Sequence, residues 1–255
     1  MKRIYVINAK KLKQIIIIFT ALLFALSIAY YERDAIAVFT KGKAKEPQAI
    51  YKVDTNEKKV ALTFDISWGE MRPGPIIDIL QEKNVKDVTF FLSSPWSQRH
   101  PETVKKIVEA GFEIGSHGHK YDFYSKYTDE EIRTQIGKAH TILTELTGVK
   151  PTLLRLPNGD FDKRVLQIAN EMGYTVIQWD TDSKDWLNPG VEQIVNNVVS
   201  NVHPGDIILM HASDSCKQTH LALPIIIDKL RAQGYQFVTV SQLLAGSQVK
   251  LQEVN

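Results

Sequence analysis

The stretch VALTFDISWG, residues 60–69, is an apolar strand pattern that ends on the carboxylate of Asp65. Four later segments also place a charged or titratable side chain directly after an apolar run: Ser116-His117-Gly118-His119, Arg155-Leu156-Pro157, Asp185-Trp186 and Leu209-Met210-His211. Parallel α/β barrels build active sites in this way, because the carboxyl ends of their strands meet at one face. The stretch therefore predicts an α/β fold with a site at the ends of its strands.

Strand and helix patterns alternate from about residue 51 to residue 246 without a second linker. The predicted strands are 60–65, 88–92, 113–116, 153–156, 175–179, 207–211 and 236–240. The predicted helices are 74–83, 101–110, 128–147, 163–172, 191–201 and 219–233. Strict alternation with short connections indicates a parallel sheet with right-handed crossovers. About seven parallel strands predict a distorted, TIM-like (β/α) barrel.

The first 37 residues differ in composition from the rest of the chain. Five basic residues precede an almost uninterrupted apolar run from residue 15 to residue 31. This pattern is typical of an exported protein, either as a secretory signal with a cleavage site at Ala35-Ile36-Ala37 or as an uncleaved membrane anchor. A buried core helix is the remaining alternative. We expect residues 38–52 to be a tether, 53–246 the globular domain and 247–255 a tail.

Charge and cysteine content narrow the class of protein. The whole chain carries +2, but residues 1–31 hold five basic and no acidic residues, so the remainder carries −3. A mildly acidic domain has no electrostatic footprint for nucleic acid. The single cysteine, Cys216, cannot form an internal disulfide, which fits an exported domain that relies on its hydrophobic core. Without an obvious activating base nearby in the sequence, we expect a packed thiol and not a nucleophile.

The titratable residues at the strand ends suit the hydrolysis of an amide. That reaction needs a nucleophilic water, stabilisation of the oxyanion and a proton for the leaving amine. A carboxylate beside a guanidinium stays ionised, and a histidine beside a carboxylate stays protonated near neutral pH. Each residue also has a purely structural alternative: Asp65 as a helix cap, Arg155 as a strand-end ion pair, His211 as a satisfied core histidine and Asp185 as a turn residue.

In order and spacing these segments resemble the polysaccharide deacetylase family, the NodB-like group also called carbohydrate esterase family four. The resemblance covers about residues 51–244, and it is greatest to the PdaB-type sporulation deacetylases. It implies hydrolysis of N-acetyl groups on peptidoglycan-type sugars. It also implies the following roles: Asp65 as general base, His211 as general acid, Arg155 and Asp185 as their orienting partners, and Trp186 and Pro157 as substrate-binding residues.

The chain departs from this family at the metal site. The family follows its base with a second, metal-binding aspartate, where this chain has Ile66. The family also has two histidines four residues apart; His117 matches the first, and Tyr121 stands at the second. The remaining candidate ligands are His117 and His119, with Asp122 as a further one. A single protein ligand is too weak to hold zinc, so a zinc-like divalent metal and a metal-free site are both alternatives.

We expect an exported glycan N-deacetylase that acts on cell-wall peptidoglycan during sporulation. Its partners would be the wall glycan and, through the N-terminal segment, a membrane facing the Gram-positive wall or forespore space. The competing hypothesis is a degenerate deacetylase that serves as a glycan-binding or membrane-tethered regulatory protein, because Ile66 and Tyr121 replace the metal ligands. Retention of the whole acid–base set favours hydrolysis, since binding alone needs no such set.

Overall fold

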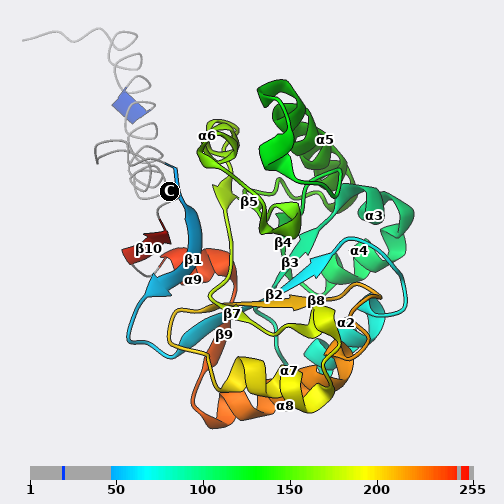
Figure 1. Ribbon diagram of the computed structural model, residues 1–255, viewed down its shortest axis with the longest axis vertical. Coiled ribbons are helices and arrows are strands. Elements are labelled where there is room, and N and C mark those ends of the chain that lie inside the picture. The colour runs from blue at the N-terminus through cyan, green and yellow to red at the C-terminus, as the bar shows by residue number, and fades with distance from the viewer. Residues whose placement is uncertain (1–18, 21–46, 246–247, 253–255) are drawn as a thin grey trace, which may run out of the picture. The chain divides into compact units, whose positions relative to one another are not determined.

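Strand β2 (Lys59–Ile66) contains the apolar run before Asp65 and lies in the middle of a parallel sheet. The computed structural model describes residues 19–20, 47–245 and 248–252. The other strands of this sheet are β3 (Thr89–Leu92), β4 (Glu113–Ser116), β5 (Leu153–Leu154), β6 (Thr175–Val176), β7 (Thr181–Asp182), β8 (Ile207–His211) and β9 (Gln236–Val238). β2 and six of these strands follow the order β6-β5-β4-β3-β2-β8-β7, and β9 pairs with the beginning of β2. The predicted parallel α/β fold is confirmed, as a half-barrel (Figure 1).

Helices surround the strands on the outside of this curled sheet (Figure 1). They are α2 (Pro73–Glu82), α3 (Ser94–Arg99), α4 (Pro101–Glu109), α5 (Asp129–Thr147), α6 (Lys163–Glu171), α7 (Val191–Val199), α8 (Thr219–Ala232) and α9 (Val240–Ala245). Local signals explain several starts: the side chain and backbone of Thr128 exchange hydrogen bonds with Glu131 in a capping box before α5. Helices α3 and α9 and strand β7 were not predicted, because each is six residues or shorter and carries no clear periodicity.

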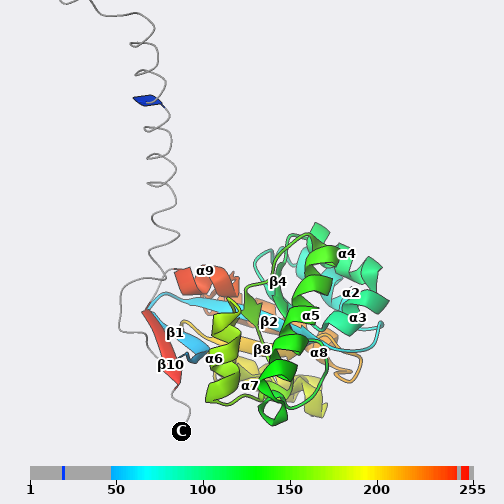
Figure 2. The same cartoon turned by 90° about the horizontal axis from the view of Figure 1, so that it is seen from above.

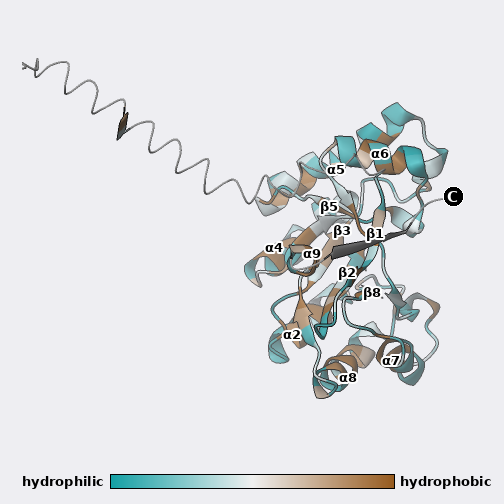
Figure 3. Ribbon diagram, turned by 90° about the vertical axis from the view of Figure 1, so that its left-hand side faces the viewer, coloured by the Kyte–Doolittle hydropathy of each residue, from teal (hydrophilic) through white to brown (hydrophobic). Residues whose placement is uncertain are grey.

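Alternate residues of β2 face opposite sides of the sheet, as the pleat of a strand requires. Val60, Leu62, Phe64 and Ile66 belong to the large apolar cluster between the sheet and its helices. Ala61 belongs to a smaller cluster inside the half-barrel, so Asp65, four residues later, faces the interior as well. Figure 3 shows the same division, with hydrophobic residues along the strands and hydrophilic residues on the outer faces of the helices.

Strand β1 (Ala49–Asp54) joins the two edges of the half-barrel. It pairs antiparallel with β10 (Gln248–Gln252), and the two lie side by side in Figure 2. The backbone N–H of Gln178, beyond β6, donates to Ile50 at 2.8 Å, and Val53 donates to Gly205, before β8, at 2.9 Å. The expected tether 38–52 and tail 247–255 were therefore placed wrongly where they overlap β1 and β10. Both strands are stabilised by pairing across about 200 residues, which local patterns do not reveal.

The expected leader, residues 1–37, lies outside the described residues apart from Phe19 and Thr20. In the part of the chain that the structure describes, no helix is both long and apolar enough to cross a membrane.

Candidate active site

Asp65 and Arg155 form a buried ion pair inside the half-barrel. Asp65 lies at the end of β2, and Arg155 directly follows β5. Arg155 Nη1 donates to Asp65 Oδ1 at 2.9 Å and to Thr63 Oγ1 at 2.7 Å. The Arg155 guanidinium is fully buried and lies 4.2 Å from the ring centre of Phe91, and its Nη2 donates to the carbonyl of Gln178 at 3.0 Å. The predicted partner of Asp65 is thus in contact with it.

Positive charge keeps the Asp65 carboxyl ionised. Burial would raise the pKa of Asp65, but the positive charge around it, above all that of Arg155, outweighs burial and lowers the pKa below its ordinary value. The carboxylate is therefore present at neutral pH. Its Oδ1 is bound by Arg155, and its Oδ2 faces His117.

His117 is a neutral imidazole whose second nitrogen faces Asp65. Its Nδ1 lies 2.7 Å from the carbonyl oxygen of Arg155, and since a carbonyl only accepts, Nδ1 carries the hydrogen. Burial lowers the pKa of His117, although the Asp65 charge opposes this. His117 Nε2 lies 3.9 Å from Asp65 Oδ2. These two acceptor atoms can receive both hydrogens of a single water molecule.

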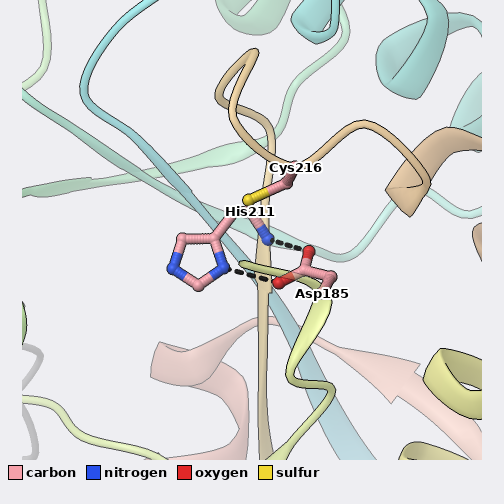
Figure 4. A group of neighbouring side chains, drawn as sticks. All are labelled: Asp185, His211 and Cys216. Atoms are coloured by element: carbon pink, nitrogen blue, oxygen red, sulfur yellow. Dashed lines mark hydrogen bonds and ion pairs between the residues drawn. The ribbon is translucent and has the colours of Figure 1, made fainter. Parts of the chain in front are cut away.

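His211 and Asp185 form the second half of the site. His211 Nδ1 lies 2.7 Å from Asp185 Oδ1, while Asp185 Oδ2 accepts from the His211 backbone N–H at 2.8 Å and from Thr219 Oγ1 at 2.6 Å. Figure 4 shows the other ring nitrogen of His211 pointing away from Asp185. Asp185 is fully buried at the start of the short helix η3 (Asp185–Leu187). The sequence did not single out Thr219, whose only local signal is its place at the first turn of α8.

The Asp185 carboxylate favours the charged form of His211. Burial would lower the pKa of His211, but the charge and hydrogen bond of Asp185 outweigh burial and raise it above the ordinary value. The imidazolium then has a free Nε2–H to donate. Because Asp65 and His211 are paired directly across β2 and β8, a proton acceptor and a proton donor lie at the same level of the half-barrel.

The residues expected to bind a metal do not come together. His119 Nδ1 lies 2.9 Å from Ser94 Oγ, and Asp122 accepts from the Tyr127 hydroxyl at 3.0 Å. Of the described residues, none of the groups of three close ligand atoms contains His117, His119 or Asp122. Ile66 packs in the outer apolar cluster, on the face opposite to Asp65. Asp65 and His117 alone offer two ligand atoms, one fewer than the three protein ligands of catalytic zinc sites, so these residues do not fit the family's metal.

Two other groups of potential ligands exist among the described residues. Asp185, His211 and Cys216 lie together in Figure 4. Asp180, His203 and Asp206 lie just before β7 and β8 begin, at the end of these strands away from His211. Burial raises the pKa of Cys216 to about 12, so its thiol stays protonated, as the sequence suggested for a packed cysteine. The oxygens of Asp185 already accept three hydrogen bonds, from the backbone and ring of His211 and from Thr219. Hydrogen bonds within the protein therefore account for this group.

Aromatic side chains stand exposed on the loops that follow the strands. Trp68 after β2, Tyr121 after β4 and Trp186 after β7 have exposed fractions of 55%, 54% and 50%. Pro157 is buried at the start of the short helix η2 (Pro157–Gly159), two residues after Arg155. Trp186 is thus available to a ligand, and the substrate-binding roles expected of Trp186 and Pro157 remain predictions.

Comparison with known proteins agrees with this geometry. A family model described as polysaccharide deacetylase matches residues 52–177. A peptidoglycan-N-acetylglucosamine deacetylase of Bacillus cereus is 37% identical over 197 residues, which are 76% of this chain and 92% of that protein. The peptidoglycan-N-acetylmuramic acid deacetylase PdaC of Bacillus subtilis is 34% identical over 75% of this chain and 40% of its own length. The chain belongs to the polysaccharide deacetylase family, a family of hydrolases that act on N-acetyl groups.

Solved structures include both enzymes and a pseudoenzyme of this family. The Bc1960 peptidoglycan N-acetylglucosamine deacetylase has a TM-score of 0.73 and 33% identity, covering 76% of this chain and 91% of that one. A CE4 family pseudoenzyme from Bacillus anthracis has a TM-score of 0.75 and 32% identity, covering 81% and 72%. A mutant of that pseudoenzyme with restored enzymatic activity has a TM-score of 0.74 and 34% identity, covering 78% and 72%.

Proposed function

We propose that this protein hydrolyses N-acetyl groups on the sugars of peptidoglycan. The single observation that carries the proposal is the pairing of Asp65, held by Arg155, with His211, held by Asp185, across neighbouring strands. The peptidoglycan substrate is supported by the names of the relatives, which deacetylate N-acetylglucosamine or N-acetylmuramic acid in that polymer.

In this mechanism Asp65 activates the attacking water. A water molecule that donates to Asp65 Oδ2 and His117 Nε2 has its lone pair free for the amide carbonyl carbon. As the new carbon–oxygen bond forms, Asp65 takes one proton from the water, and the carbonyl electrons move onto the oxygen. The lowered pKa of Asp65 makes it a weak base, so the step depends on close positioning rather than on basicity.

His211 completes the reaction as the acid. When the tetrahedral intermediate collapses, the carbon–nitrogen bond breaks, and the nitrogen takes a proton from His211 Nε2. The products are acetate and a free amine on the sugar. Asp185 keeps His211 protonated and oriented, since its Oδ1 holds Nδ1 and its Oδ2 is fixed by Thr219.

Acetate release from acetylated peptidoglycan fragments tests the proposal. The full chain is assayed with and without chelator, beside Asp65→Asn and the exposed, remote Asp78→Asn in α2 as a matched control. We expect release that survives chelation, falls at least about 100-fold in Asp65→Asn and is unchanged in Asp78→Asn. An absence of release under any metal supplementation would reject hydrolysis.

A second candidate function is glycan binding without hydrolysis. It is favoured by the missing third metal ligand and by the likeness to a pseudoenzyme. Binding of acetylated glycan fragments without acetate release, weakened by Trp186→Ala, is the result expected of such a protein.

We also infer that the protein is exported and acts at the cell wall during sporulation. The basic, then apolar leader supports export, and the resemblance to PdaB-type deacetylases supports the sporulation role. Fractionation of sporulating cells with an antibody to the domain tests both. Detection of the protein only in the cytoplasm or only in growing cells would contradict this assignment.

A further inference from the structure

Tyr121 stands beside the reacting groups, at the position where the family has its second histidine. Its ring meets the His117 ring edge-on, with 5.8 Å between ring centres. Its hydroxyl lies by the backbone N–H of Asn158, the residue after Pro157. Because His117 Nε2 lies 3.9 Å from Asp65 Oδ2, the Tyr121 ring stands next to the pair of acceptors proposed to bind the attacking water.

The loop that carries Tyr121 is fixed by the buried side chain of Tyr124. Gly118, with φ of +73°, leaves no room for a side chain, since an added Cβ would lie 2.4 Å from the Tyr124 hydroxyl. The same hydroxyl accepts from the backbone N–H of His119 at 3.1 Å, and Tyr124 is fully buried. A donor on a fixed loop costs little reorganisation when charge develops in a transition state.

The other side chains of the site leave one chemical role unfilled. Asp65 Oδ2 and His117 Nε2 are acceptors, and the guanidinium nitrogens of Arg155 donate to Thr63, Asp65 and backbone carbonyls. His211 Nε2–H is committed to the leaving nitrogen in the proposed reaction. A developing oxyanion still needs a hydrogen-bond donor, and a phenol is one.

We propose that the Tyr121 hydroxyl donates its hydrogen bond to the substrate carbonyl oxygen and stabilises the oxyanion that forms there. This inference rests on the proposed function. Tyr121 keeps its proton throughout: the carbonyl electrons move onto oxygen while Asp65 receives the water proton, and they return when the carbon–nitrogen bond breaks. The phenol thereby takes over the charge stabilisation that a metal supplies in metal-dependent deacetylases.

The test compares Tyr121→Phe with wild-type full chain in steady-state acetate release. We expect kcat to fall about 100-fold with little change in KM, because an oxyanion donor acts mainly in the transition state. The melting temperature should stay constant, since Tyr121 is 54% exposed. The matched control is Tyr235→Phe, whose hydroxyl donates to Val202 beside β9 and away from Asp65; its kcat should match wild type.

The outcomes separate this inference from the proposed function. Wild-type activity with an unchanged kcat in Tyr121→Phe would overturn the role of Tyr121 and leave the proposed function standing. A wild-type protein that releases no acetate rejects the proposed function by itself, and the role of Tyr121 falls with it. Tyr121→His adds a second readout: restored activity that depends on added zinc would show that this position serves a metal, against our inference.

Discussion

Asp65 and Ile66 are adjacent in the chain but face opposite sides of β2. Asp65 meets Arg155 inside the half-barrel, while Ile66 is fully buried among apolar side chains outside it. The strand continues through Ile66, whose carbonyl accepts from Ser93 at 2.9 Å. A carboxylate substituted at this position would therefore enter an apolar cluster and not the site.

Ile66→Asp is expected to destabilise the protein by about 3–5 kcal/mol, because an unpaired charge would be buried. Ile66→Val, which removes one methylene group, should cost only about 1 kcal/mol. Chemical denaturation gives both values, and zinc titration of Ile66→Asp gives the second readout. A variant that folds as stably as wild type and binds zinc tightly would show that the chain turns inward at residue 66.

The raised pKa of His211 predicts the alkaline limb of the pH profile. In the proposed reaction His211 acts as the protonated acid, so kcat/KM should hold above pH 6.5 and fall only as pH rises through the raised pKa. The pKa of Asp65 is lowered from its ordinary value of 3.8, so this carboxyl stays ionised even at pH 3.8. Asp65 therefore adds no acid limb near neutral pH. Asp185→Asn should move the alkaline limb to lower pH.

Thr219→Val is the control for this profile, since it removes one hydrogen bond from Asp185 but keeps the charge. The alkaline limb of the Thr219→Val profile should lie at a pH close to that of wild type. An alkaline limb that does not move in Asp185→Asn would contradict the assignment of His211 as the acid.

At the scale of elements, the loop between β2 and α2 is shaped by the loop after β8. The Asp214 carboxylate accepts from the backbone N–H groups of Glu70, Met71 and Arg72. Trp96 Nε1 donates to the carbonyl of Gly69 at 2.6 Å. These contacts hold the loop that presents Trp68, so this part of the rim is built without a metal ligand.

Gly69→Ala should therefore destabilise the protein by about 1–3 kcal/mol. Gly69 has φ of +86°, and an added Cβ would lie 2.2 Å from Asp214 Cγ. Gly137→Ala in α5 is the matched control: its Cβ position lies 3.8 Å from Met172 Cε, an ordinary van der Waals contact, and the change should stabilise by about 0.5–1 kcal/mol. Equal effects of the two substitutions in thermal denaturation would refute this account of the loop.

At the scale of the whole molecule, β1 and β10 bring the two ends of the domain together. β1 contacts the segment after β6 and the segment before β8, and thus joins the edges that the seven-stranded path leaves apart. Lys52 of β1 adds an ion pair of 2.8 Å with Asp180. On the β6 side the contact of β1 lies next to the site, because the carbonyls of Ile177 and Gln178 accept hydrogen bonds from Arg155.

Truncation after Ala245 removes β10 and is expected to loosen β1. Hydrogen exchange should speed up over Ala49–Asp54, whose backbone loses its antiparallel partner, while β2 stays protected as the internal reference. Acetate release by the truncated chain should persist, since Asp65 and His211 lie on β2 and β8, which pair with each other and not with β10. Unchanged exchange in β1 would mean that its bridges to Ile177 and Asp206 suffice.

The sequence by itself determined the long helices, most strands of the parallel sheet and the identity of the residues at the strand ends. Those features follow from periodicities of two and 3.6 residues and from local caps, as at β2 and α5. The placement of Arg155 beside Asp65 also followed, because parallel strands end at one face.

Only the tertiary structure decided which neighbours those residues meet. It turned His119 toward Ser94, fixed Asp122 on Tyr127, brought Tyr121 to His117 and paired β1 with β10. Such contacts depend on the path of the backbone between distant segments, which local patterns do not encode. The stretch that ends on Asp65 thus specified the carboxylate that we propose as the base, whereas the fold decided that Ile66 beside it lies in the core.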